Sequence, residues 1–225
     1  MTKAPLNKAM KRRTYDSSSR KAAALDTRRS IIEAARRLFL ENGYAGTTMP
    51  AIANASSTAL DTIYATIGKK PALFRLLVET AISGANEAQP AEQRDYVGAM
   101  RAEPDAKRKF KIYAAALSNI QPRLAPLFRV LQAAAPTDPD LRALWQEISE
   151  RRARNMRLLA QDLAATKQLR NGLSEAAVAD VIWTMNSPEF YLLLVEQRGW
   201  SSDEFERWLS DAWERLLLAP SSCLR

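Results

Sequence analysis

The 225-residue sequence contains no histidine and a single cysteine, Cys223. Without histidine, a Ser-His-Asp triad and a histidine-based zinc or iron site are impossible. One thiol can form neither an internal disulfide nor a thiolate metal cluster. This cysteine usage is typical of a reducing compartment, so we expect a cytoplasmic protein without a bound metal.

Glycine is also scarce, and the seven glycines never reach the spacing of the G-x-G-x-x-G or G-x-x-x-x-G-K nucleotide motifs. Ser18 and Lys21 match the bare S-x-x-K pattern of some acyl enzymes, but they lie in a polar segment without a surrounding core. Acidic residues are plentiful, although nothing in the sequence pairs them for catalysis. We predict no catalytic residues, no cofactor and no enzymatic activity; a carboxylate-based enzyme on a helical scaffold remains an alternative.

Long hydrophobic runs are absent as well. No apolar stretch approaches the roughly 20 residues that span a bilayer, and residues 1–29 lack the apolar centre of a signal peptide. We therefore expect neither a membrane span nor a secretory leader.

Positive charge is concentrated near the N-terminus. Residues 1–29 hold nine basic side chains and two acidic ones, in a chain whose net charge is +8. A basic head on a nearly neutral body favours an anionic polymer or surface as partner. A membrane surface is disfavoured because residues 1–24 show no apolar face, whereas a disordered solubilising tail remains an alternative for this arm.

The rest of the chain has the pattern of helices, because Ala, Leu, Arg and Glu dominate and no stretch alternates with period two. After a flexible arm over residues 1–24, apolar residues three and four positions apart predict a helix from about Thr27 to Glu41. Gly43 is suited to the left-handed position that ends it.

Two short helices are then predicted, over residues 49–55 and 60–67. Thr48 is a plausible cap and Pro50 fits a first helical turn. Two short helices joined by a tight turn and preceded by a longer helix form a helix-turn-helix. The small and polar side chains on the second short helix can approach base edges in a DNA groove.

The stretch from Arg29 to Phe74 resembles the N-terminal domain of the tetracycline-repressor (TetR) family. The resemblance rests on AA-x-x-LF-x-x-x-GY-x-x-TT, the following IA, the T-I-Y of the third helix and the G-x-K before the fourth. It implies an all-α protein with a three-helix DNA-binding domain and a helical ligand-binding and dimerisation domain. The expected boundaries are 1–24 for the basic arm, 25–85 for the helix-turn-helix domain and 86–225 for the effector-binding and dimerisation domain.

The resemblance also implies roles for individual residues, in contact with the DNA backbone or with the groove. The candidate DNA contacts are Thr47, Thr48, Leu60, Asp61, Thr62, Tyr64, Ala65, Lys69 and Lys70 in the head, and Arg20, Lys21 and Arg28 from the arm. A partly buried core position is an alternative for Tyr64, and a merely solvated charge is one for Lys69.

The sequence departs from the family in the turn, which reads Ser-Ser-Thr-Ala over residues 56–59 where Ala-Gly-Val-Ser is common. Ser57 stands where glycine accepts a positive φ, at a cost of about 1 kcal/mol. Ala59 replaces the usual serine cap, so we expect Ser57 or Thr58 to cap the recognition helix instead. Ile67 replaces a usual phenylalanine.

The body is predicted as further helices, several of them opened by proline. Their expected ranges are 91–101, 104–119, 122–135, 139–168, 174–186, 188–198 and 203–218. The apolar stripe of the long helix over 139–168 is interrupted at Arg152 and Asn155, although such a stripe usually indicates core packing.

Two late helices carry more large apolar residues than one side of a surface helix buries. These residues are Trp183, Phe190, Tyr191, Leu193, Leu194, Trp208, Trp213 and Leu217. In the resembling family, late helices pair across a two-fold axis, so we expect a homodimer; a core within one chain is the alternative.

By the same resemblance, an effector pocket lies inside the body. Its candidate residues mix aromatic bulk with isolated amides, as a mostly apolar pocket requires, and plain core packing is the alternative for each. They are Tyr113, Asn119, Phe128, Trp145, Asn155, Met156, Trp183 and Asn186. The expected function is a repressor that an unknown small molecule releases from a palindromic double-stranded DNA operator. The alternative is a helical adaptor whose basic arm binds acidic partners or membranes.

Overall fold

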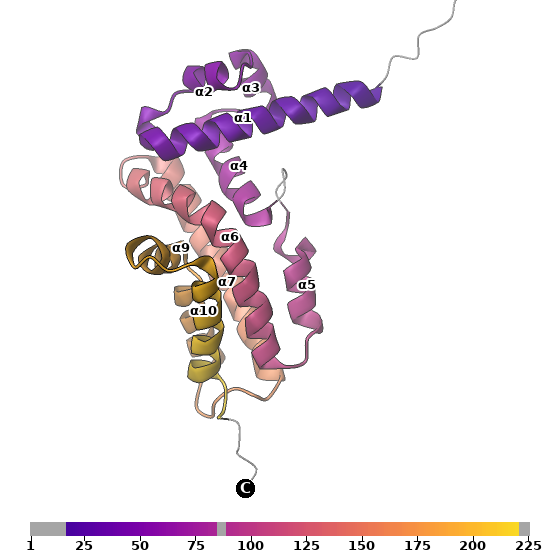
Figure 1. The fold of residues 1–225 in the computed structure, drawn as a ribbon, viewed down its shortest axis with the longest axis vertical. Helices are drawn as coiled ribbons and strands as arrows, with labels where there is room; N and C mark the ends of the chain where they lie inside the picture. Colours follow the sequence, from indigo (N-terminus) through magenta and orange to yellow (C-terminus); the bar gives the residue numbers. More distant parts are fainter. Residues whose placement is uncertain (1–16, 85–88, 221–225) are drawn as a thin grey trace, which may run out of the picture.

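The computed structural model describes residues 17–84 and 89–220, with side chains from residue 22 onward, and Figure 1 shows their arrangement. The head comprises α1 (Ser17–Gly46), α2 (Met49–Ala55), α3 (Leu60–Thr66) and α4 (Lys70–Ser83). The body comprises η1 (Ala91–Gln93), α5 (Asp95–Ala102), α6 (Ala106–Ala134), α7 (Pro139–Ala165), α8 (Glu175–Met185), α9 (Pro188–Leu192), the π-helical turn η2 (Leu193–Gln197) and α10 (Ser202–Leu217).

The predicted all-α fold with a head and a body is confirmed. Within the described residues every regular element is helical, and β-type pairing is limited to one isolated bridge between Leu169 and Leu218. The pair α2–α3 lies on the side of α1 that faces away from the body, while α6 and α7 form the long axis of the body below α1 (Figure 1). The end of the described chain lies at the opposite pole from α2 and α3.

Helix α1 begins at Ser17, ten residues before the predicted start at Thr27, so residues 17–24 are helical rather than part of a flexible arm. The Ala22-Ala23-Ala24-Leu25 run explains the extension, because alanine and leucine have the highest helix propensities. Gly43 interrupts the helix with φ 68° and ψ 179°, close to where the sequence predicts its end. Residues 1–16 of the predicted arm, like Cys223, lie outside the described residues.

Helix α6 is one continuous helix with Pro122 and Pro126 inside it, so the predicted break between residues 119 and 122 is wrong. A proline inside a helix costs about 3 kcal/mol, because it removes a hydrogen bond and clashes with the preceding turn. The buried side chains of Leu117, Leu124 and Leu127 flank both prolines. Packing around the central helix, at about 1.5–3 kcal/mol per buried leucine, offsets that cost.

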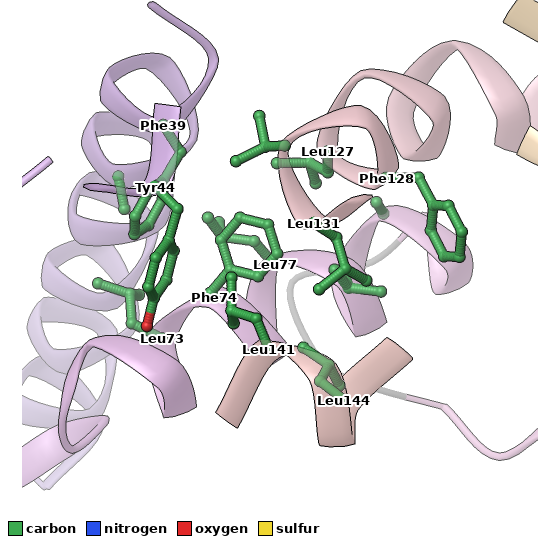
Figure 2. Close-up of a cluster of buried hydrophobic side chains, with 14 of the residues drawn as sticks. Phe39, Tyr44, Leu73, Phe74, Leu77, Leu127, Phe128, Leu131, Leu141 and Leu144 are labelled. Atoms are coloured by element: carbon green, nitrogen blue, oxygen red, sulfur yellow. The ribbon is translucent and has the colours of Figure 1, made fainter. Parts of the chain in front are cut away.

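One hydrophobic core spans the head and the body (Figure 2). In the head, Phe39 meets Phe74 edge to face at 5.1 Å, and Tyr44 meets Phe74 in the same way at 5.5 Å between ring centroids. The body side of the same cluster consists of Leu127, Phe128 and Leu131 from α6 and Leu141 and Leu144 from α7. A shift of α6 or α7 is therefore felt by α1 and α4 through direct packing.

A second core lies lower in the body and fixes the ring of Tyr113. Trp213 of α10 is fully buried and stacks on Tyr113 at 5.5 Å between centroids, with an interplanar angle of 11°. Tyr96 of α5 stacks on the same tyrosine at 6.1 Å. The two neighbours leave the Tyr113 ring little freedom to rotate.

In the part of the chain that the structure describes, no helix combines the length and the apolar character that crossing a membrane requires.

Candidate functional site

The connection between α2 and α3 is a tight turn after a capped helix. The Oγ1 atom of Thr48 accepts a hydrogen bond of 3.2 Å from the Ala51 N–H, and Pro50 occupies the first turn of α2. Ser57 has φ 51°, which confirms the positive φ expected where the family has glycine. Short helix, turn and short helix follow one another as the sequence predicts.

Helix α3 begins without a side-chain cap. Ala59 is its N-cap residue, and no side chain accepts a hydrogen bond there. The Oγ1 atom of Thr58 donates instead to the Ser56 carbonyl at 3.2 Å. The expectation that Ser57 or Thr58 replaces the missing serine cap is therefore wrong, because the Thr58 hydroxyl turns back toward α2.

One face of α3 is anchored and the other is open. Ile63 is fully buried, whereas Asp61 and Ala65 are exposed and Tyr64 keeps 44% of its surface accessible. The remaining groove candidates, Leu60 and Thr62, are half-buried at the boundary between the two faces. This face offers small and polar groups at the pole of the molecule that lies farthest from the body (Figure 1).

Two lysines stand at the start of α4, beside α3. Lys69 is the exposed N-cap residue, and the ammonium of Lys70 lies 4.1 Å from the centroid of the Tyr44 ring. Partial burial lowers the pKa of Lys70, and the charge of Asp138 opposes this. No role for Tyr44 is predicted from the sequence, although this residue belongs to the GY motif that carries the family resemblance.

Thr47 and Thr48 differ in accessibility. Thr47 is buried, and its hydroxyl donates to the carbonyls of Leu38 at 3.0 Å and Gly43 at 2.8 Å. A phosphate contact by the Thr47 hydroxyl does not fit this placement, because the group holds the end of α1 against the start of α2. Thr48 is exposed, and its hydroxyl hydrogen points to no acceptor that the structure records.

The candidate contacts of the arm lie along the first half of α1. Arg28 is half-buried there. The backbone of Arg20 and Lys21 is helical, but their side chains lie outside the described ones.

The body contains a cavity of about 160 Å³ between α4, η1, α5, α6, α7 and the start of α9. Five of the eight candidate ligand residues line it, namely Tyr113, Phe128, Asn155, Met156 and Asn186. The other three lie elsewhere. Asn119 is exposed and bonds to the Ala115 carbonyl of its own helix, Trp145 packs on Phe128, and Trp183 lies against Arg152.

Several polar side chains meet at Asn186, which is buried in the cavity wall. Its Nδ2 atom donates to the Tyr113 hydroxyl at 2.8 Å, and its Oδ1 atom accepts from Nη2 of Arg152 at 2.6 Å. The same guanidinium nitrogen donates to the Trp183 carbonyl at 2.7 Å. Nε2 of Gln121 donates to the Asn186 carbonyl at 2.8 Å, while Oε1 of Gln121 is buried without a hydrogen-bond partner.

Arg152 is the main residue that the sequence analysis missed in the cavity. Burial lowers its pKa, with Tyr113 and Glu189 acting in the opposite direction. Burial likewise raises the pKa of Tyr113, with the nearby Tyr96 acting in the same direction and Asn186, Arg152 and Arg94 opposing. The available signal was the interruption of the α7 apolar stripe at Arg152 and Asn155, which both line the cavity.

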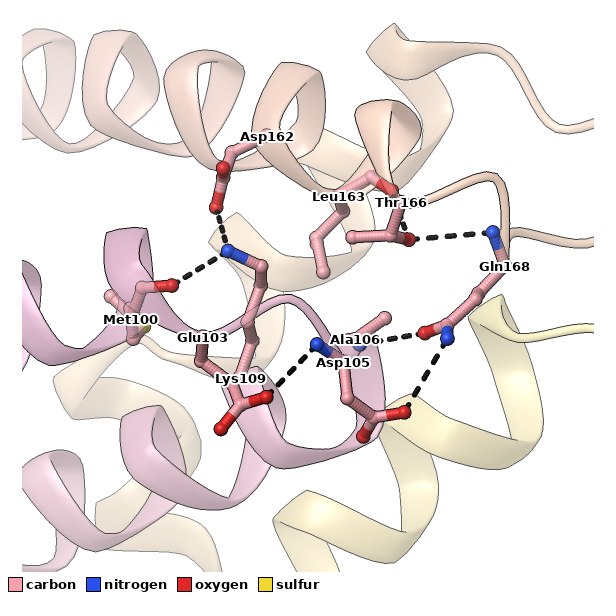
Figure 3. A network of polar contacts seen from close by, with 9 residues as sticks. All are labelled: Met100, Glu103, Asp105, Ala106, Lys109, Asp162, Leu163, Thr166 and Gln168. Carbon is pink, nitrogen blue, oxygen red and sulfur yellow. Dashed lines mark hydrogen bonds and ion pairs between the residues drawn. The ribbon is translucent and has the colours of Figure 1, made fainter.

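Asp162 in the cavity wall forms an ion pair within a polar network (Figure 3). The Nζ atom of Lys109, whose side chain is 3% exposed, lies 2.7 Å from Oδ2 of Asp162 and donates to the Met100 carbonyl at 2.6 Å. Next to it, Gln168 joins the α7–α8 connection to the start of α6 by accepting from the Ala106 N–H at 2.7 Å. Asp162 lines the cavity, but its charge is already paired.

The late apolar residues fall into three groups, which are buried, exposed or half-buried. Tyr191, Trp213 and Leu217 are buried within the chain, which follows the intrachain alternative for these three. Leu193 and Trp208 are exposed at 50% and 37%. The half-buried Phe190 stacks on Trp208 at 5.6 Å, whereas Trp183 and Leu194 are half-buried elsewhere.

Comparisons with known proteins match both the head and the whole fold. Residues 31–77 match the family of bacterial regulatory proteins described as the tetR family. NalD of Pseudomonas aeruginosa, the secondary repressor of the MexAB-OprM multidrug efflux pump, superposes with a TM-score of 0.69 at 20% identity, over 88% of this chain and 99% of that one. A comparison with curated protein sequences finds no match.

Two further similar structures hold a small molecule. A transcriptional regulator from Saccharomonospora viridis, in complex with choline, has a TM-score of 0.63 at 17% identity, over 85% of this chain and 97% of that one. SmeT in complex with triclosan has a TM-score of 0.60 at 17% identity, over 87% of this chain and 93% of that one.

The helix-turn-helix head on a helical body defines the class of protein as a DNA-binding transcriptional regulator. Residues 31–77 match the TetR family of bacterial regulatory proteins, and the chain shares its fold along most of its length with structures such as NalD.

Proposed function

We propose that this protein is a homodimeric repressor that binds a palindromic operator and is released from it by a small molecule held in the body. The observation that carries the proposal is the open face of α3, anchored by Ile63 and flanked by Lys69 and Lys70, in a chain whose residues 31–77 match this family. The protein acts on DNA in the cytoplasm and has no catalytic role.

The exposed groups of the head divide by the kind of contact they offer. Asp61, Thr62 and Ala65 face outward or lie at the edge of α3 and read base edges. Thr48, Tyr64, Lys69 and Lys70 serve as backbone contacts, because hydroxyls and ammonium groups bind phosphate without regard to sequence.

The homodimer forms through the late helices. Leu193, Trp208 and Leu216 expose 50%, 37% and 51% of their surface, and large apolar side chains that solvent surrounds in one chain favour a protein interface. Dimerisation suits DNA recognition because two recognition helices about 34 Å apart read successive turns of the major groove.

Coupling between the cavity and the head follows from shared contacts. The Nε atom of Arg123 on α6 donates to the Ala81 carbonyl of α4 at 3.1 Å, and Nη1 of Arg36 on α1 donates to the Arg123 carbonyl at 3.0 Å. A ligand that displaces α6 or α7 therefore moves α1 and α4, and with them the separation of the two recognition helices. A coupling of about 1–3 kcal/mol suffices for a 5- to 150-fold switch.

The decisive experiment is selection of bound DNA from a random pool with the purified full-length protein. We expect a two-fold symmetric consensus, a steep loss of affinity with salt at a log–log slope of about −0.9 for each phosphate contact, and strong preference over random DNA. Indifference to every duplex at low salt would overturn the proposal and favour an adaptor with a basic arm.

A further inference from the structure

The charges that line the cavity do not balance. Arginines 94, 101, 151 and 152 and one acid, Asp162, line it. Arg151 pairs with Glu79 at 2.7 Å, and Asp162 pairs with Lys109 at the same distance. Among the described residues, the other three arginines have no carboxylate within 4 Å.

Among these unpaired cations, Arg152 is half-buried and lies against the buried Asn186. Its recorded hydrogen bonds use Nη2 alone and go to two neutral oxygens, those of Trp183 and Asn186. Glu189 is within electrostatic reach, but its Oε1 atom accepts from Gln132 at 2.7 Å and its Oε2 atom has no hydrogen-bond partner. A half-buried guanidinium whose Nε and Nη1 atoms have no recorded protein acceptor favours an anionic partner.

Two further hydrogen-bond donors at the cavity have a weak acceptor or none. The Tyr113 hydroxyl accepts from Asn186, and its own hydrogen points to the sulfur of Met156 at 3.7 Å, a weak acceptor. The Nε atom of Arg94 is buried without a hydrogen-bond partner. Tyr113, Arg94 and Arg152 all line this cavity, and both arginines oppose the rise of the Tyr113 pKa that burial causes.

Apart from the amides of Gln121, Asn155 and Asn186, most of the remaining lining is apolar, with Leu117, Leu124, Phe128, Ile148 and Leu159 among its residues. The volume of about 160 Å³ is close to that of an engineered cavity of about 150 Å³ that binds benzene. The space therefore suits a ligand with one ring or a short chain.

We propose that the effector of this protein is a small, mostly apolar carboxylic acid, whose carboxylate is held by Arg152, the Tyr113 hydroxyl and Arg94. A carboxylate supplies the acceptors that all three donors lack, and its charge offsets that of the half-buried guanidinium. This inference rests on the proposed function, because it names the ligand class of the same cavity.

The test compares acids with their amides, which have nearly the same shape and no charge. Binding of benzoate, phenylacetate and hexanoate to the full-length protein is measured by calorimetry beside benzamide, phenylacetamide and hexanamide. We expect at least one acid to bind ten-fold or more tightly than its amide. Amides that bind as well as the acids, or a protein that binds none of the three acids, would overturn the proposal.

Three variants locate the carboxylate. Arg152→Gln is expected to abolish the preference for acid over amide, and Tyr113→Phe to weaken acid binding about five-fold while amide binding stays the same. Arg154→Gln, an exposed position on the same helix, is the control and keeps the preference. If Arg152→Gln does not fold, Tyr113→Phe and Arg94→Gln decide; a preference that survives in both contradicts the assignment.

Operator binding is measured separately so that the two proposals can fail independently. Acid binding without any change in operator affinity supports the ligand class of the cavity but overturns the claim that the acid is the effector. Operator binding without any acid binding leaves the regulator in place and overturns the ligand class.

Discussion

The carboxylate of Glu79 on α4 accepts a hydrogen bond of 2.7 Å from the guanidinium of Arg151 on α7. Arg151 lines the cavity, and the next residue, Arg152, is the half-buried cation beside Asn186. One turn of α7 thus contacts both the cavity and the last helix of the head. The ion pair therefore joins the cavity-lining part of α7 directly to α4.

Glu79→Gln is expected to weaken the coupling between ligand and operator. The two side chains are 14% and 32% exposed, so the ion pair contributes about 1 kcal/mol to stability, and its loss lowers Tm by about 2–4 °C. The ratio of operator affinities without and with saturating benzoate, measured by fluorescence anisotropy, should fall toward one. Arg154→Gln is the control, and an unchanged ratio in Glu79→Gln would show that the coupling runs through other contacts, namely the shared hydrophobic core and the hydrogen bonds of Arg123.

Lys70→Gln should weaken binding to all duplexes alike. The Lys70 ammonium is held over the Tyr44 ring, so it is already oriented before DNA arrives. Loss of one phosphate contact reduces the log–log salt slope by about 0.9 and leaves the base preference unchanged. Lys111→Gln, an exposed lysine on α6, serves as the control; a shifted consensus in Lys70→Gln would instead place this residue at the base edges.

The head could be predicted almost completely from the sequence because its signals are local. Pro50 sets the first turn of α2, Gly43 interrupts α1, and Ser57 takes the positive φ that the turn needs. The charge and polarity of residues 17–24 predict a flexible arm, whereas their helix propensity decides their structure, so the predicted start of α1 is ten residues too late.

The body was less predictable because its structure depends on distant contacts. Pro122 and Pro126 indicate a helix boundary locally, and packing against six other helices keeps α6 continuous. The place of Arg152 in the cavity wall is not predictable from the sequence for the same reason. An arginine in an apolar stripe is usually solvated, and its partial burial here depends on Asn186 and Trp183, more than 30 residues away.

Thr47→Val should separate a structural role from a DNA contact. The buried hydroxyl donates to the carbonyls of Leu38 and Gly43, and leaving these acceptors unpaired lowers the free energy of unfolding by about 1–3 kcal/mol. The salt slope of operator binding should stay the same, because no phosphate contact is lost. Thr48→Ala, by contrast, removes an exposed cap and should reduce the slope; a reduced slope in Thr47→Val would restore that residue as a phosphate contact.

Ser57→Gly should stabilise the head. Ser57 has φ 51°, and an L-residue in this region costs about 1–2 kcal/mol, part of which glycine gives back through its greater freedom in the unfolded chain. We expect the free energy of unfolding, from urea denaturation, to rise by about 0.5 kcal/mol. Ala55→Gly at the exposed end of α2 is the control and should lower it, and a destabilised Ser57→Gly would mean that the serine side chain supports the turn.

Lys109→Met tests the charge balance of the cavity. It leaves the carboxylate of Asp162 at the cavity wall without its cation. Because the lysine is 3% exposed and the aspartate 35%, we expect a loss of about 2–3 kcal/mol in the free energy of unfolding.

The same substitution should weaken benzoate binding, since an unpaired negative charge then faces the ligand, while benzamide binding changes little. Asp162→Asn removes the negative charge instead and should strengthen benzoate binding. A cationic acid-binding cavity requires that the affinity for benzoate, measured by calorimetry, falls in one variant and rises in the other. Equal shifts for acid and amide would show that the pair acts on the shape of the cavity and not on its charge.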